Sequence, residues 1–342
     1  MKDFYKLYSV EQSGKSTKKP YSRGKSFGYQ ILGFGSGVPD TGVAHRGVWG
    51  GAFLADSSTS DVIDFVVIAT LGDATDFGNQ SVARSRNHSG AASSTRGLFF
   101  GGNTAGSPAV RRNIIDYVTI ATAGNATDFG DCSSTTQMGT AGNNDTRAVH
   151  ALGDTSDNSV NTLEYVTIGS TGNTTDFGDL SLDRNAAAGC SSNTRICYAG
   201  GYSYSASGTT NTIDYITTGS TGNASDFGDL TVVRSALSAC SSSTRGVWAG
   251  GNDAAGNVID YVTIGSTGNA TDFGDLSSVA EDSSGGTSNK IRGLFAKGGT
   301  PSRDKAIDYI TIASTGNGAD FGDRTVAGTY AAACSNGNGG LA

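Results

Sequence analysis

The acidic residues of this chain recur in a repeated string, which reads Gly-Asn-Ala-Thr-Asp-Phe-Gly-Asp in one of its copies. Two carboxylates of that string, Asp272 and Asp275, lack the dense spacing of oxygen ligands that a calcium loop needs. Carboxylates further upstream, such as Asp116 and Asp214, recur as well, whereas a general acid and base form a single pair. We therefore interpret the acids as parts of turns and scaffold.

The cysteines and histidines form no recognisable metal or redox motif. The five cysteines are odd in number and include no Cys-x-x-Cys pair, so neither a zinc site nor a disulfide framework is predicted. Three of them, Cys190, Cys240 and Cys334, each follow a repeated Phe by 13 residues and are predicted to be small buried residues of one repeated strand. The histidines fall in different repeats, at His45, His88 and His150. No metal, cofactor or catalytic residue is predicted.

These residues belong to a repeat of about 50 residues, marked by Asp-Phe-Gly. Its Phe stands at Phe77, Phe129, Phe177, Phe227, Phe273 and Phe321. An aromatic residue precedes each Phe by 12 positions, and further upstream an Arg opens a short apolar run that mostly ends in Gly-Gly. Runs rich in β-branched and aromatic residues predict four short strands per repeat, separated by Gly and Asn turns. No segment is long and periodic enough for a helix, so an all-β propeller is predicted.

The repeat resembles the kelch repeat, with a Gly-Gly pair closing one strand, an acidic residue and Tyr in the next, and an aromatic a dozen residues on. The resemblance covers Arg46 to Ser335 and implies a six-bladed kelch-like β-propeller with four antiparallel strands per blade. The chain has Phe where kelch repeats usually have Trp, and its third repeat, at Ala151-Leu152-Gly153, lacks the double Gly. A copper oxidase on such a fold would need more histidines and a Tyr–Cys pair at the hub. Asp-Phe-Gly without a Lys strand or a His-Arg-Asp loop does not indicate a kinase either.

The ring is expected to close through the C-terminal strand. Residues Thr329–Asn338 repeat the Cys-bearing strand once more, and pairing them with Arg46–Gly51 would remove an exposed edge. In the alternative, Phe27–Phe34 completes the first blade and the C-terminal strand is an overhang. The predicted organisation is an anchor peptide at residues 1–27, a linker at 28–44, the propeller at 45–338 and a tail at 339–342.

The charge of the chain is unevenly distributed. The whole chain carries −7, yet the segment from Met1 to Ser26 has seven basic and two acidic residues. The remaining acidic body argues against nucleic-acid binding by the propeller, because phosphate contacts need clustered Lys and Arg. No run of 18 apolar residues occurs, so no membrane span is predicted, and the leader has no apolar core of a secretory signal.

The leader, residues 14–37, is similar to the N-terminal segments of virion proteins from marine, cyanophage-like bacteriophages. This resemblance implies that residues 1–35 dock onto other virion proteins. The anchor residues would be Lys15, Lys18, Lys19, Tyr21, Arg23 and Lys25. A tail without a role is the alternative, although the aromatic residues of the leader favour a segment that orders when docked.

Two classes of loop alternate along the chain. Loops such as Ser-Ser-Ser-Thr and Ser-Thr-Gly-Asn are nearly the same in every repeat, whereas the loops after Gly-Gly differ widely and are expected on the opposite face. A recognition surface needs different loops, so Tyr202, Tyr204, Arg111 and Arg112 are predicted to bind a ligand or partner. The alternative is a set of solvated loops that are free to drift.

The leading hypothesis is a non-enzymatic phage structural protein: a tail, fibre or capsid-surface component of the virion, assembled in the host cytoplasm. Its propeller would contact another virion protein, a host-surface glycan or a receptor, and self-association on the particle is compatible with this. An intracellular kelch-type interaction module is the alternative. A glycan hydrolase is a third hypothesis, weakened by the lack of clustered carboxylates and of an Asp-box.

Overall fold

The computed structural model describes residues 44–341 except 87–88, 107, 157, 253–255 and 300–302. The predicted anchor, the alternative strand Phe27–Phe34 and His88 lie outside the described residues. Residues Ala44–Ala342 form one compact unit, to which the following description applies. The described residues contain strands and turns only, and no helix among them is suited to crossing a membrane.

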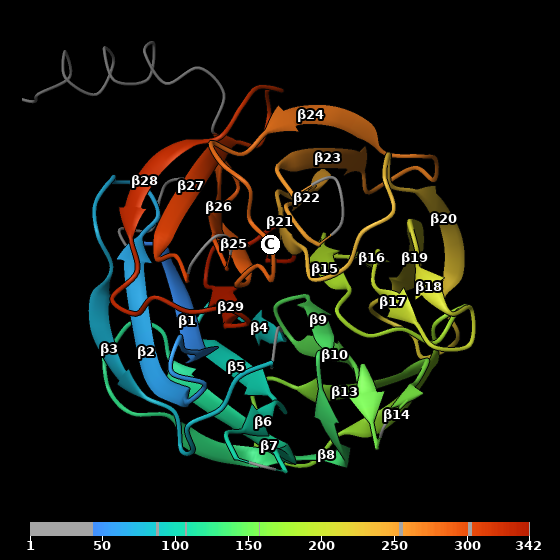
Figure 1. Cartoon of the computed structure of the whole chain (residues 1–342). Helices are drawn as coiled ribbons and strands as arrows, with labels where there is room; N and C mark the ends of the chain where they lie inside the picture. Colours follow the sequence, from blue (N-terminus) through green and yellow to red (C-terminus); the bar gives the residue numbers. More distant parts are fainter. Residues whose placement is uncertain are drawn as a thin grey trace, which may run out of the picture. The chain divides into compact units, whose positions relative to one another are not determined.

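The strands form antiparallel sheets arranged around a central axis as a β-propeller (Figure 1). Five sheets have four strands each, and the first-named strand of each lies nearest the axis. The first holds β29 (Ala332–Ser335), β1 (Arg46–Phe53), β2 (Thr59–Val67) and β3 (Thr75–Asn79). The third repeat contributes β9 (Thr140–Asn143), β10 (Arg147–Ala151), β13 (Thr162–Thr167) and β14 (Thr175–Asp179). The fourth contributes β15 (Ala188–Ser191), β16 (Arg195–Ala199), β19 (Thr212–Thr217) and β20 (Ser225–Asp229).

The last two repeats follow the same order. The fifth consists of β21 (Ser238–Ser241), β22 (Arg245–Ala249), β23 (Val258–Thr263) and β24 (Thr271–Asp275). The sixth consists of β25 (Gly286–Ser288), β26 (Arg292–Ala296), β27 (Ala306–Thr311) and β28 (Ala319–Asp323). A separate two-stranded sheet pairs β17 (Tyr202–Ser203) with β18 (Gly208–Thr209).

The second repeat departs from the predicted set of six separate four-stranded sheets. Its strands β4 (Gly90–Ala92), β5 (Arg96–Phe100), β7 (Val110–Thr119) and β8 (Thr127–Gln137) lie in a sheet of seven, with β6 (Asn103–Thr104), β11 (Asp154–Thr155) and β12 (Asn158–Ser159). The cause is the length of β8, which has 11 residues where the other outermost strands have five. Its extension pairs with β11, so the prediction of a separate four-stranded sheet is wrong at this repeat.

The first sheet contains both the first and the last described strands of the ring. Gly47 pairs with Ser335 and Val48 with Cys334, so the C-terminal strand occupies the innermost position beside β1 (Figure 1). The predicted pairing of this strand with Arg46–Gly51 is confirmed. The innermost strands contact one another in succession, and β29 contacts β4. The ring is therefore closed by noncovalent pairing of segments from the two ends of the unit.

The Arg that opens each repeat joins two neighbouring sheets. Arg195, for example, lies 4.6 Å from the ring centroid of Tyr215 in its own sheet, and it donates to the carbonyl of Ile264 in the next repeat at 3.0 Å. The same two contacts recur at Arg46, Arg96, Arg147, Arg195, Arg245 and Arg292. Because Arg292 reaches back to the carbonyl of Ile68, this cation–π and hydrogen-bond pattern also joins the sixth repeat to the first.

The Asp-Phe-Gly string lies on the outermost strand and binds the turn of the following repeat. Gly268 N–H donates to the carbonyl of Phe227 at 2.8 Å, and Asp229 N–H donates to the side chain of Asn269 at 3.1 Å. Equivalent contacts recur around the ring and end with Gly72 N–H on the carbonyl of Phe321 at 2.9 Å. The Asp-Phe-Gly segment is therefore one of the four strands predicted for each repeat, and its backbone is bound by the turn of the neighbouring repeat.

Small residues allow the neighbouring sheets to approach closely. Cys190, Cys240 and Cys334 are buried and free, as predicted. A Cβ atom at Gly97 would lie 2.6 Å from the sulfur of Cys334, so the Gly after an opening Arg and the Cys of an inner strand are matched in size. These thiols fill space between sheets, which explains their recurrence without any redox role.

The contact between outermost strand and turn predicts a difference between two glycines of similar backbone conformation. Gly274 (φ +142°) and Gly268 (φ +153°) both disfavour a side chain, but only at Gly274 would a Cβ meet backbone, 2.6 Å from the carbonyl oxygen of Gly316. Gly268→Ala is expected to lower the free energy of unfolding by about 1–2 kcal/mol through backbone strain alone. Gly274→Ala is expected to cost about 1–3 kcal/mol more, measured by chemical denaturation. Equal losses in the two variants would contradict this account of the contact.

Candidate functional site

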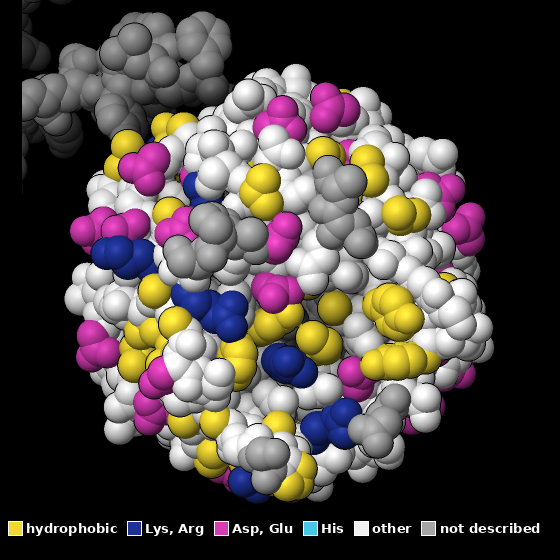
Figure 2. All heavy atoms as spheres, in the orientation of Figure 1, with side chains coloured by type: hydrophobic (Ala, Val, Ile, Leu, Met, Phe, Trp, Pro, Cys, Tyr) yellow, Lys and Arg dark blue, Asp and Glu magenta, His cyan; other side chains and the backbone are white. Residues whose placement is uncertain are grey.

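The two faces of the ring differ in the loops that they carry. Because consecutive strands are antiparallel, the connections from first to second and from third to fourth strand share one face, which we call the constant face. The connections from second to third strand, and from each outermost strand to the next innermost one, share the variable face. Figure 2 shows the variable face, where hydrophobic, Lys or Arg, and Asp or Glu side chains surround a hollow near the centre.

The end of the central channel at the constant face is covered by the C-terminal segment. Asn338 donates to the side chain of Asn143 at 3.2 Å, and Leu341 is buried. The space between the innermost strands has a volume of about 40 Å³, which suffices for a few water molecules. This space is too small for an organic ligand, which leaves the variable face as the candidate binding surface.

A ring of six residues surrounds the channel at the variable face. They stand nine positions after each repeated Phe and are called the rim residues: Arg86, Met138, Ala186, Ala236, Asp282 and Tyr330. All six have a positive φ between 47° and 60°, which non-glycine residues rarely adopt. Ala186 N–H donates to Met138 and Ala236 N–H to Ala186, each at 2.8 Å, which fixes this backbone. The same strained backbone therefore recurs at six positions that carry five different types of side chain.

The rim combines cationic, acidic, aromatic and apolar groups. The guanidinium of Arg86 lies 5.7 Å from the ring centroid of Tyr330 and 6.0 Å from that of Phe53, and Arg303 lies 5.0 Å from Phe53. Burial and a hydrogen bond with Asp282 raise the pKa of Tyr330, which keeps its hydroxyl protonated. Two arginines beside aromatic rings form an environment that suits an anionic or polar group of a partner.

Tyr202 and Tyr204, both predicted from sequence, come together on the variable face of the fourth repeat. Their ring centroids lie 5.3 Å apart in an edge-to-face arrangement, and Tyr204 is 46% exposed. Nearby, Asp183 accepts hydrogen bonds from the hydroxyls of Ser159, Ser203 and Ser205. Burial alone would raise the pKa of Asp183, but these hydrogen bonds outweigh it and lower the pKa. An exposed aromatic pair and a carboxylate thus lie on the same part of this face.

The predicted site residues do not all lie together in the structure. Arg111 and Arg112 lie on β7 of the second repeat and are partly exposed, whereas the two tyrosines belong to the fourth. The rim residues were missed by the sequence analysis, which considered only the loops after Gly-Gly. A signal for them was present, because the ninth residue after each Phe changes from repeat to repeat.

The repeated carboxylates lie at the interfaces between neighbouring sheets, where they are fully buried. Asp116 pairs with Arg84 at 3.0 Å, Asp214 with Arg184 at 2.8 Å and Asp260 with Arg234 at 2.9 Å. In the sixth and first repeats the cation comes from other positions, as Lys297 on Asp308 and Arg324 on Asp64. The fourth residue after each repeated Phe, a Ser or Thr, also donates to the acid, as Ser181 does to Asp214. These acids are bound in structural ion pairs.

Neither a protein-family model nor a curated protein sequence matches this chain. The functional argument therefore rests on the residues and on their geometry.

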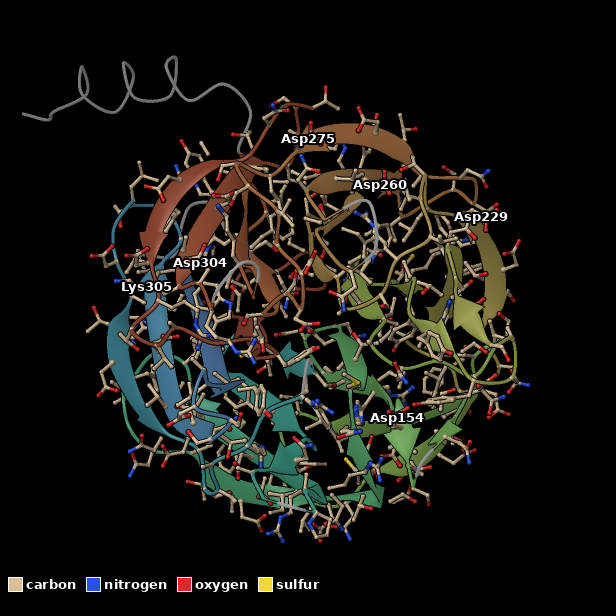
Figure 3. The ribbon with its side chains drawn as sticks, in the orientation of Figure 1. Asp154, Asp229, Asp260, Asp275, Asp304 and Lys305 are labelled. Carbon is tan, nitrogen blue, oxygen red and sulfur yellow. The ribbon has the colours of Figure 1, made fainter. Side chains whose placement is uncertain are left out.

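Removing one partner of a buried ion pair is expected to destabilise the propeller strongly. Arg234→Leu would leave the buried carboxylate of Asp260 without its cation, so we expect a loss of about 3–5 kcal/mol in the free energy of unfolding. The control is Lys305→Ala, because Lys305, which Figure 3 labels, forms an exposed pair with Asp323, and its loss should have little effect. Urea denaturation compares the variants, and similar losses in both would contradict the structural role assigned to the buried pairs.

Proposed function

We propose that this chain is a non-enzymatic binding protein of a bacteriophage particle, a tail, fibre or capsid-surface component. Residues 1–35 would attach it to other virion proteins, and the propeller would present its variable face to a partner. The observation that carries the binding part is the contrast between the faces. The constant face repeats its loops and is covered by the C-terminal segment, whereas the rim holds one backbone conformation with diverse side chains.

The burial of the repeated acids supports a binding role over glycan hydrolysis. A hydrolase needs two carboxylates that reach the substrate from opposite sides of the scissile bond. The five repeated aspartates described above are 0% exposed and each is paired with Lys or Arg. Such groups are unavailable as general acid or base. Asp183 is accessible, but three serine hydroxyls already hold its carboxylate.

We also propose that the ring counts as six kelch-like blades. The second would comprise β4, β5, β7 and β8, with β6, β11 and β12 as additions from loops of the variable face. The Arg contacts that recur at every repeat support this count, as does the succession of contacts among the innermost strands. The kelch-like order of Gly-Gly, acidic residue, Tyr and later aromatic is the sequence feature that supports the kelch assignment.

The partner that this face fits best is a polar or anionic group on a host surface, such as a glycan, or an acidic segment of another virion protein. Tyr204 offers an exposed aromatic surface, and Arg86 offers a guanidinium held between two aromatic rings. Aromatic rings stack on the apolar faces of sugars and of peptide groups, while a guanidinium binds carboxylates in a bidentate manner.

Deletion of residues 1–35 tests the anchoring part of the proposal. The shortened chain is expected to keep the circular dichroism spectrum and thermal midpoint of the full chain, because the described sheets begin at Arg46. It should no longer assemble onto the particle, measured by the protein content of purified virions. A shortened chain that still joins the particle would contradict the anchor, and binding of one specific host protein from lysate would favour the intracellular alternative.

Substitutions on the variable face test the binding part. Tyr204→Ala and Arg86→Gln are each expected to weaken binding to glycans or to partner virion proteins by at least tenfold, since each removes about 1.4 kcal/mol or more of contact. The matched control is Thr221→Ala on an exposed turn of the constant face, which should bind as the original chain does. Glycan-array screening with analysis of products measures binding and cleavage together. A cleaved glycan would contradict the non-enzymatic role.

A further inference from the structure

One interface between neighbouring sheets departs from the ion-pair pattern of the others. In the third repeat the buried acid is Glu164 on β13, and its partner across the strand pair is His150 on β10, where the other repeats have Trp, Phe or Tyr. The seventh residue after the repeated Phe, which is Arg in three of the repeats, is Thr136 at this interface. The preceding repeat also brings Cys132 on β8 to this interface.

The three side chains converge at one point of the interior. The sulfur of Cys132 lies 3.8 Å from Nδ1 of His150, and this nitrogen lies 3.9 Å from Oε1 of Glu164. The three donor atoms lie within 4.8 Å of one another, and all three side chains are at least 97% buried. The other carboxylate oxygen of Glu164 accepts from Ser133 N–H at 3.2 Å, whereas no hydrogen bond satisfies Oε1. An unsatisfied buried carboxylate oxygen therefore points toward a thiol and an imidazole.

The surroundings hold the imidazole in a fixed orientation. The ring of Phe100 stacks on His150 with centroids 4.9 Å apart and an interplanar angle of 24°. Gly139 leaves room for the edge of the ring that carries Nε2, because a Cβ atom at residue 139 would lie 2.5 Å from that nitrogen of His150. Phe100 stands at a position where most of the repeats have Ala. A larger side chain therefore lies beside His150, which is itself smaller than the Trp, Phe or Tyr of the other repeats. The nitrogen Nδ1 is thereby directed at the cluster.

We propose that Cys132, His150 and Glu164 form a buried site for one divalent metal ion, with zinc as the preferred ion. Thiolate, imidazole and carboxylate are all zinc ligands, at bond lengths of about 2.0–2.3 Å. Tetrahedral geometry at those lengths places the donors about 3.3–3.6 Å apart, so the observed cluster needs only small movements of its side chains to close. The three residues would supply three of the four ligands of a tetrahedral site.

The charge balance of the interface supports a metal ion at this site. At each of the other interfaces a Lys or Arg neutralises the buried acid. A zinc ion with a thiolate, a carboxylate and a neutral imidazole carries the same net charge of zero. Because a metal binds the thiolate form of cysteine, binding at Cys132 would release the thiol proton to solvent. The metal would thus take the place of the missing Arg.

Cobalt substitution tests the site in the full chain. After chelation under reducing conditions, titration with Co²⁺ is expected to bind one ion per chain and to give a thiolate-to-cobalt charge-transfer band, which Zn²⁺ abolishes by competition. Glu164→Gln keeps the size of the side chain, and Cys132→Ser removes the thiolate. Each is expected to weaken metal binding more than about 100-fold, because losing even a residue that only hydrogen-bonds to a ligand costs about 10- to 100-fold.

The matched control is Cys240→Ser, which removes a buried thiol remote from the cluster and should leave the cobalt band unchanged. Thermal melts with and without Zn²⁺ give a second readout, in which only the original chain and the control are expected to be stabilised. The proposal is overturned if the folded original chain binds no stoichiometric metal, if its cobalt complex lacks the thiolate band, or if Glu164→Gln binds metal as tightly as the original chain.

Discussion

The burial of one carboxylate at each interface between neighbouring sheets is the constraint on which the ring depends. An ionised carboxylate in the interior costs several kcal/mol unless a cation and hydrogen-bond donors surround it. The chain meets this requirement at each interface with a Ser or Thr backbone N–H, and at five interfaces with Lys or Arg. Because acid and donor come from different repeats, the interaction forms only when two sheets are correctly placed.

The sequence position that supplies the cation varies among these five ion pairs, but in each of them the cation contacts the buried acid. Arg84, Arg184 and Arg234 come from the connection between sheets, whereas Lys297 extends from the end of a strand in the same repeat as its acid. This variation is expected because the buried carboxylate requires a positive charge beside it and not a side chain of one particular shape. The cluster around Glu164 is the one departure among these interfaces, and a bound cation is the simplest way to meet the same requirement.

Scaffold and recognition are separated by the alternation of strand direction. The outer Asp-Phe-Gly strands, the Arg–aromatic contacts and the Gly–Cys packing all serve the joints between repeats, which requires the same residues each time. The rim residues share a strained backbone but no side-chain type. Backbone strain of this kind persists only where the surrounding structure enforces it, and the inter-repeat hydrogen bonds between Ala186, Met138 and Ala236 do so.

The sequence by itself determined the all-β repeat, the four-strand order, the buried role of Cys190, Cys240 and Cys334, and the closure of the ring by the C-terminal strand. These properties follow from spacing, because residues with equal intervals occupy equal places in a repeated sheet. Tertiary structure alone decided that β8 extends into a seven-stranded sheet, that the turn of the next repeat binds the Asp-Phe-Gly strand, and that Cys132, His150 and Glu164 converge. These features depend on contacts between different repeats, and residues 18 or 32 positions apart on separate strands leave no local pattern from which their meeting could be read.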